Sequence, residues 1–118
     1  MKQLLISFII MLFLLTTIGC LEHNEKGIDY IEVFWSKTSE DSIETLPFIN
    51  NTIPSQIHVD YIELSEGTLE EVMVKISRFR RYKLEKVPSV VIHKGLFGNV
   101  ILQGKYEVEE RLEEEVGN

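Results

Sequence analysis

The chain divides into an apolar N-terminal run and a longer region in which apolar and polar residues follow short repeating patterns. Residues 3–19 (QLLISFIIMLFLLTTIG) carry no charge, and nearly all charged residues lie after them. Residues 28–35 (IDYIEVFW) are rich in β-branched and aromatic side chains, which predicts a buried strand. Residues 56–64 alternate between polar and apolar side chains and predict a second strand.

A helix is predicted between these two strands. Thr38 or Ser39 can act as its N-cap, and the acidic residues that follow suit the positive end of the helix dipole. The apolar positions continue to Ile49, and Pro47 lies inside the helix. An interior proline removes one backbone hydrogen bond, so we expect a kink there.

A second helix is predicted from Thr68 to about Tyr82. Thr68 and Glu71 have the spacing of a capping box, in which side chains satisfy the free amides at a helix start. The apolar residues of this helix form one stripe: Leu69, Val72, Met73, Ile76 and Phe79. We expect this stripe to lie in the core, and a binding groove is the alternative.

The remaining pattern predicts a hairpin and a final helix. Residues 89–92 and 100–102 are typical of strands, and the turn at 94–99 between them contains glycines. A charged helix with an apolar position every four residues closes the chain. The order strand–helix–strand–helix–strand–strand–helix predicts an α/β domain, with a mixed sheet of about four strands flanked by helices.

The N-terminal run has the features of an export or anchoring segment. Met1 and Lys2 supply a short positive region, the apolar run follows, and residues 16–20 (TTIGC) resemble a bacterial lipobox. This resemblance implies cleavage before Cys20 and attachment of a diacylglycerol to its thiol. An uncleaved anchor helix is an alternative, because the run is close to the lower limit of about 17 residues for spanning a bilayer. A secreted soluble form is the third possibility.

These three possibilities share one domain organisation. Residues 1–19 are a signal peptide or membrane anchor, residues 20–27 are a short polar tether, and residues 28–118 are the folded domain. In each case the domain lies outside the cytoplasm. In the first two it is held at the extracytoplasmic face of the cell membrane.

Charge and cysteine content narrow the chemistry. The formal net charge is −7, which argues against nucleic acid as a partner because phosphate binding needs clustered Lys and Arg. One basic cluster is expected to be a solvated helix face, or alternatively a patch for an acidic partner: Arg78, Arg80, Arg81, Lys83 and Lys86. Cys20 is the only cysteine, so the folded domain has no intrachain disulfide, cysteine zinc site or thiol nucleophile. His58 and Asp60 alternate with apolar residues and are expected to face solvent rather than bind a metal, and no cofactor is implied.

Several residues at characteristic spacings resemble the thioredoxin superfamily. Phe34 and Trp35 match the pair that ends the family's central strand, and Pro47 matches the kinking proline of its active-site helix. Residues 82–89 (YKLEKVPS) are similar to the run that carries the family's cis-proline, which makes Pro88 the candidate cis-proline. The resemblance implies a thioredoxin-like three-layer fold over nearly all of the domain.

The two redox cysteines of that family are absent. Counting back from Pro47 places their positions at Ser39 and Ser42, and Val33 stands where the family's buried aspartate is expected. A serine hydroxyl cannot exchange with a disulfide, so we expect no thiol–disulfide oxidoreductase activity. No histidine lies beside these serines in the sequence, and helix capping accounts for both of them. We therefore expect no catalytic residue.

The resemblance leaves two functional hypotheses. The family's groove beside the cis-proline can pair with an extended chain, which implies a non-catalytic module that binds a polypeptide partner. Trp35, Thr38, Val87 and Pro88 would line that groove. The alternative is an accessory component of an extracytoplasmic thiol–disulfide or export system whose partners supply the thiols.

Overall fold

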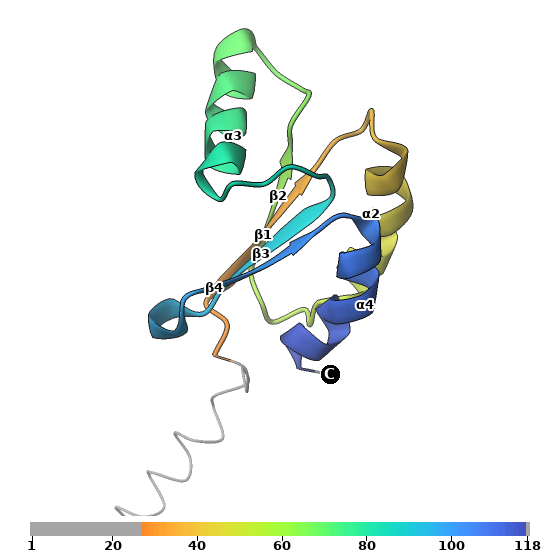
Figure 1. Cartoon of the computed structure of the whole chain (residues 1–118), viewed down its shortest axis with the longest axis vertical. Coiled ribbons are helices and arrows are strands. Elements are labelled where there is room, and N and C mark those ends of the chain that lie inside the picture. The colour runs from red at the N-terminus through yellow and green to blue at the C-terminus, as the bar shows by residue number, and fades with distance from the viewer. Residues whose placement is uncertain (1–26, 118) are drawn as a thin grey trace, which may run out of the picture.

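Four strands form a mixed sheet in the computed structural model, which describes residues 27–117 (Figure 1). The strands are β1 (Tyr30–Trp35), β2 (Val59–Glu63), β3 (Ser89–His93) and β4 (Asn99–Gln103). Their order across the sheet is β2-β1-β3-β4. β1 and β2 run parallel, whereas β3 is antiparallel to both β1 and β4.

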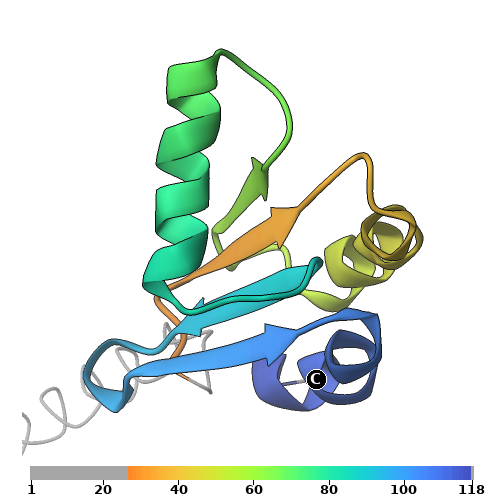
Figure 2. The same cartoon turned by 45° about the horizontal axis from the view of Figure 1, so that its top comes forward.

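Helices cover both faces of this sheet. They are α2 (Glu40–Thr52), α3 (Leu69–Arg81), α4 (Lys105–Val116) and the short 3-10 helix η1 (Gly95–Phe97). α2 and α4 lie side by side on one face, and α3 lies on the other (Figure 2). The structure confirms the predicted order of elements and the mixed sheet flanked by helices, and this layout fits the three layers that the resemblance implies.

The predicted N-terminal features fall outside the described residues. These are the signal or anchor at residues 1–19, the lipid attachment at Cys20, and the tether up to residue 26. Within residues 27–117, no helix combines the length and the apolar character needed to cross a membrane.

The helices α2 and α3 begin at the residues that their capping patterns predict. Ser39 is the N-cap of α2, and Thr68 is the N-cap of α3, where its hydroxyl accepts a hydrogen bond from the Glu71 amide at 3.2 Å. Pro47 lies inside α2, as expected. Local side-chain chemistry therefore sets the starts of these helices.

The larger part of the core lies between the sheet and the pair α2 and α4. β1 supplies Ile31 and Val33 to this side, because alternate side chains of a strand point to the same face. Its other members come from all the elements packed there: Ile28, Ile49, Ile53, Val90, Ile92, Leu102, Val108, Leu112 and Val116. The apolar positions predicted on the last helix are thus confirmed as core.

The apolar stripe of α3 was expected in the core, and that expectation is wrong for most of the helix. None of the residues of α3 is buried, and the side chains of Leu69 and Met73 are 77% and 60% exposed. The reason is the position of the helix, whose N-terminal half extends past the end of the sheet (Figures 1 and 2). Only the C-terminal end packs closely, where the rings of Phe79 and Tyr82 meet Phe34 edge-on at centroid distances of 5.8 and 6.0 Å.

A buried carboxylate fastens α3 to the sheet. Glu32 of β1 is 2% exposed and faces α3 rather than α2 and α4. Its Oε1 accepts a hydrogen bond from the Tyr82 hydroxyl at 2.6 Å and lies 2.6 Å from Nε2 of His93. Its Oε2 forms an ion pair with Arg78, which also contacts Asp60 at 3.2 Å. A buried charge is costly unless it is paired, so this network determines where the end of α3 sits.

The same contacts set the protonation of the network. Burial works to raise the pKa of Glu32, but hydrogen bonds from Tyr82, His93 and Arg78 outweigh it and hold the pKa below its usual 4.5. Burial of the Tyr82 hydroxyl, together with its bond to Glu32, raises the pKa of Tyr82 to about 12. Glu32 is therefore ionised and Tyr82 is a neutral donor at neutral pH.

We predict that Glu32→Gln lowers the free energy of unfolding by about 2–3 kcal/mol at pH 7, because it removes the buried charge that pairs with Arg78. The depressed pKa of Glu32 means that its stabilising effect is complete above pH 4.5 and is lost as the pH falls below that value. The difference between wild type and variant should therefore shrink in acid. Urea unfolding at a series of pH values measures it.

Glu107→Gln is the matched control. Glu107 pairs with Arg111 at 3.3 Å on the exposed surface of α4, where an ion pair contributes only about 0.5 kcal/mol. A Glu32→Gln variant as stable as this control at neutral pH would contradict the role given to the buried carboxylate.

Candidate functional site

The two serines at the start of α2 are both engaged in backbone contacts. The Ser39 hydroxyl accepts a hydrogen bond from the Ser42 amide at 3.3 Å, as an N-cap does. Ser42 is fully buried, and its Oγ accepts a hydrogen bond from the Ser36 amide at 3.2 Å. These hydroxyls therefore hold the turn between β1 and α2.

In the described part of the chain, the hydroxyls of these serines contact the backbone rather than a general base. Within residues 27–117, neither hydroxyl is hydrogen bonded to a histidine or a carboxylate. Val33 occupies the core beneath α2, and the neighbouring Glu32 points to the opposite face of the sheet. The arrangement lacks the nucleophile–base contact that covalent catalysis by serine requires.

The turn before β3 lies on one side of the start of α2. The Val87–Pro88 peptide bond is cis, and the Pro88 carbonyl accepts a hydrogen bond from the Gly104 amide at 2.8 Å. Val87 lines a depression of about 650 Å³ there together with Asp41 of α2. Polar and charged side chains make up most of its remaining wall: Lys86, Gln103, Gly104, Lys105, Tyr106, Glu107 and Glu110.

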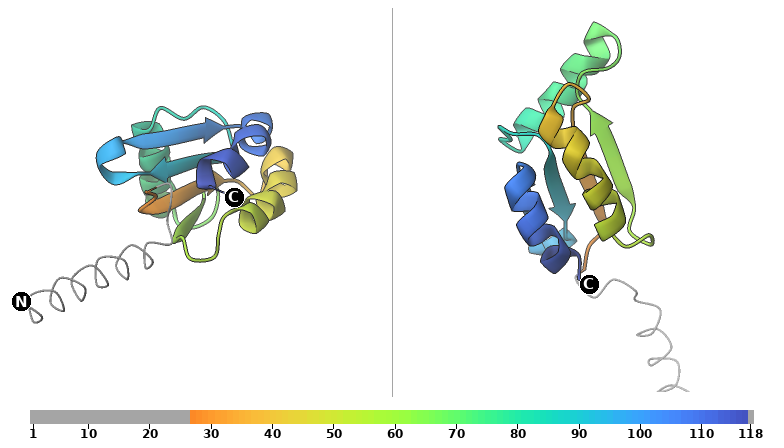
Figure 3. Two further views of the ribbon diagram at one scale, coloured as in Figure 1. Left: turned by 90° about the horizontal axis from the view of Figure 1, so that it is seen from below. Right: turned by 90° about the vertical axis from the view of Figure 1, so that its right-hand side faces the viewer.

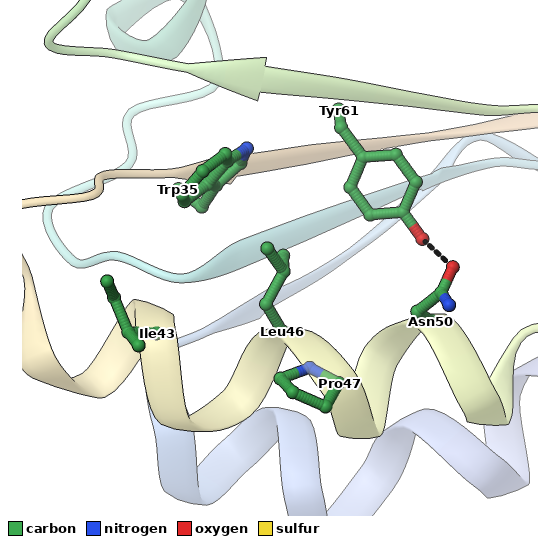
Figure 4. A pocket seen from close by; sticks show the side chains of 6 residues that line it. All are labelled: Trp35, Ile43, Leu46, Pro47, Asn50 and Tyr61. Atoms are coloured by element: carbon green, nitrogen blue, oxygen red, sulfur yellow. Dashed lines mark hydrogen bonds between the residues drawn. The ribbon is translucent and has the colours of Figure 1, made fainter.

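An apolar groove lies on the other side of α2, between this helix and β2. Its volume is about 540 Å³, and six residues line it: Trp35, Ile43, Leu46, Pro47, Asn50 and Tyr61 (Figure 4). Four of these come from one face of α2, at the spacing of successive helical turns. The Tyr61 hydroxyl donates a hydrogen bond to Asn50 Oδ1 at 3.2 Å, and burial raises the pKa of Tyr61.

Trp35 contributes an unsatisfied polar atom to this groove. Its indole Nε1 is buried and has no hydrogen-bond acceptor among residues 27–117. The nitrogen lies on the side of the ring that faces Tyr61 (Figure 4). A buried donor without a partner costs about 1–3 kcal/mol, so this nitrogen is an unfavourable feature of the groove wall.

The backbone of β2 is open beside the groove. β2 is an edge strand of the sheet formed by residues 27–117, paired only with β1. The Ile31 amide bonds to the His58 carbonyl at 3.0 Å and the Leu64 amide to the Trp35 carbonyl at 2.9 Å, so the even-numbered residues of β2 face β1. The amides and carbonyls of Val59, Tyr61 and Glu63 therefore point away from the sheet.

The structure separates the residues that the sequence placed in one groove. Trp35 lines the apolar groove, whereas Val87 lines the polar depression on the far side of α2, next to Pro88. Thr38 is exposed at the turn, where its hydroxyl lies 2.8 Å from Ser36 Oγ.

Most residues of the apolar groove carry no signal in the sequence that marks them as a site. Ile43, Leu46 and Asn50 have helical spacing in the sequence, but this spacing does not show whether that face meets the core or solvent. Ile43 is 52% exposed. The alternation of residues 56–64 places Tyr61 on one face of the strand with Ile57 and Val59, and this was the available signal for the β2 side of the groove.

Arg78 differs from its sequence-based expectation, whereas Asp60 largely meets it. Arg78 belongs to the cluster expected to be a solvated helix face, and the structure gives it partners inside the domain, Glu32 and Asp60. The side chain of Asp60 is 47% exposed, in line with the expectation that it faces solvent, and it forms the second of these ion pairs. A scan of family models and searches of curated proteins and solved structures found no match to this chain.

We predict that Ser39→Ala lowers the free energy of unfolding by about 1 kcal/mol, because the Ser42 amide loses its cap. Ser42→Ala should cost about 1–3 kcal/mol, since it leaves the buried Ser36 amide without its acceptor. Thermal and urea unfolding measure both. Ser39→Asp is the control: aspartate is an equally good N-cap, so stability should be retained. A loss with aspartate as large as that with alanine would mean that Ser39 does not cap α2.

Proposed function

We propose that this protein is an extracytoplasmic, membrane-tethered domain with a thioredoxin-like fold that binds an extended polypeptide without redox chemistry. The observation that carries the proposal is the apolar groove lying directly beside the open edge of β2. An edge strand supplies backbone hydrogen bonds to an added strand, and an adjacent groove supplies pockets for its side chains.

The absence of thiols in the domain supports a binding role rather than an exchange reaction. Cys20 is the only cysteine of the chain and lies in the tether, before the domain begins. Ser39 and Ser42 occupy the positions that the resemblance assigns to the redox pair, and both hydroxyls are used to hold the turn. The cis bond before Pro88 agrees with the resemblance as well.

The groove favours an apolar anchor on the bound chain. A strand added to β2 would bond to the outward backbone groups of Val59, Tyr61 and Glu63, and every second side chain would point toward α2. Trp35, Ile43 and Leu46 would receive that side chain, and burying one of leucine size contributes about 1.5–3 kcal/mol.

The tether places this activity at a membrane surface. Residues 3–19 are uncharged and apolar, and Cys20 follows Gly19 directly, as in a lipoprotein signal. The domain would therefore meet its partner outside the cytoplasm, at the outer face of the cell membrane.

The test uses the full chain in detergent micelles and a set of synthetic unstructured peptides, each with a central leucine or phenylalanine. We expect NMR shifts on peptide addition at the amides of Val59 and Tyr61 and at the Trp35 indole. Ile43→Asp should weaken peptide binding by about tenfold or more, because the apolar side chain of the peptide would then meet a charged carboxylate in the groove instead of an apolar surface.

Two controls locate the site. Val74→Asp changes an exposed apolar residue of α3 outside the groove and should leave the affinity unchanged. Peptides methylated on alternate backbone nitrogens should lose binding, because they cannot pair with an edge strand. Shifts confined to Val87 and Gly104, or affinities unaffected by Ile43→Asp, would contradict a site at β2 and move it to the depression beside Pro88.

A further inference from the structure

The turn between β3 and β4 presents two large apolar side chains to solvent. Leu96 is fully exposed and Phe97 is 87% exposed, and they are neighbours in η1. Single exposed apolar residues are normal on protein surfaces, but adjacent ones at a projecting tip point to an interaction.

The tip is an ordered turn. The Lys94 amide bonds to the Gly98 carbonyl at 2.9 Å and the Phe97 amide to the Lys94 carbonyl at 3.1 Å. Gly95 and Gly98 have φ values of +58° and +81°, which favour glycine. The hydrogen bonds and the two glycines therefore fix a turn on which Leu96 and Phe97 point to solvent rather than into the core.

This tip lies at the end of the sheet where the described chain begins. The Asp29 amide donates to the His93 carbonyl at 2.7 Å, and a side chain on Gly95 would approach the Asp29 carboxylate to 2.9 Å. Gly27 is only two residues before Asp29. Figure 3 shows the start of the described chain beside the light-blue turn.

The length of the tether limits the distance between this end of the domain and a membrane. Residues 21–27 separate Cys20 from the domain, and seven residues span at most about 25 Å when fully extended. If residues 3–19 and Cys20 are held in a bilayer, the end of the domain nearest to that bilayer is the one that carries Leu96 and Phe97.

We propose that Leu96 and Phe97 insert into the surface of the bilayer that holds the N-terminal segment, so that the domain sits on the membrane in one orientation. This inference rests on the membrane tether of the proposed function and not on peptide binding. Trp35 ends β1 at the opposite end from Tyr30, so its end of the apolar groove faces away from the bilayer.

The contact is apolar rather than electrostatic. Lys94 next to the tip is paired with Glu115 at 3.4 Å, Asp29 beside the tip is acidic, and the chain has a net charge of −7. Anionic lipids therefore gain little here, and insertion should occur in neutral lipid and persist at high salt.

The experiment uses the full chain reconstituted in phosphatidylcholine vesicles. A polarity-sensitive fluorophore is attached to Leu96→Cys or, as the control, to Glu70→Cys in the first turn of α3, which is distant from the tip (Figure 1). Cys20 is common to both variants, so the difference between them reports on position. We expect a spin-labelled lipid to quench the fluorophore at position 96 several-fold more than that at position 70, with no change at high salt.

A second variant tests the neighbour. Adding Phe97→Ser to Leu96→Cys should reduce the quenching to nearly the control level. Protein that stays on the vesicles with equal quenching at both positions would overturn the inserted tip and leave the tether intact. Protein that does not associate with vesicles would overturn the tether and this inference together. A label that is shielded but insensitive to the lipid quencher would show that the tip contacts a second copy of the chain, which also overturns it.

Discussion

The burial of β1 on both faces is the constraint on which the rest of the structure depends. This strand is paired with β2 on one side and β3 on the other, and alternate residues face opposite layers. Ile31 and Val33 enter the core beneath α2 and α4, whereas Glu32 must find its partners under α3. A shift of one residue would exchange these faces and bury Glu32 where no partner is available, so the register of β1 is strongly specified.

The same register positions the two ends of the domain. Tyr30 pairs with His93 and brings the start of the domain next to the turn that carries Leu96 and Phe97. Trp35 ends the strand at the groove beside α2. A single strand thus separates the end that we assign to the membrane from the groove that we assign to the partner. β2 has no second neighbouring strand among the described residues, so its outer edge is open beside that groove.

Local patterns predicted the elements well, because caps, strand alternation and turn glycines act over a few residues. Ser39 and Thr68 cap their helices, and the order of strands and helices follows the sequence periodicity. The failures concern packing between distant segments. The stripe of α3 shows that the helix is amphipathic, but not that its first half extends past the sheet, where Leu69 is exposed.

The candidate site was only partly predictable for the same reason. Trp35 was identified, but the groove around it depends on which face of α2 meets the edge of the sheet. Glu32 was a visible signal, since a charge inside an otherwise apolar strand needs a partner. Those partners, Arg78, Tyr82 and His93, lie far along the chain, and no local spacing connects them to β1.

Hydrogen exchange at the amides of β2 tests the central claim most directly. In the free full-length chain, the amides of Val59, Tyr61 and Glu63 should exchange quickly, whereas those of Asp60 and Ile62, which face β1, should be protected. Addition of a peptide with an apolar anchor should slow the first group and leave the second unchanged. Protection of Tyr61 in the free chain, or no change in the first group when peptide is bound, would contradict strand addition at this edge.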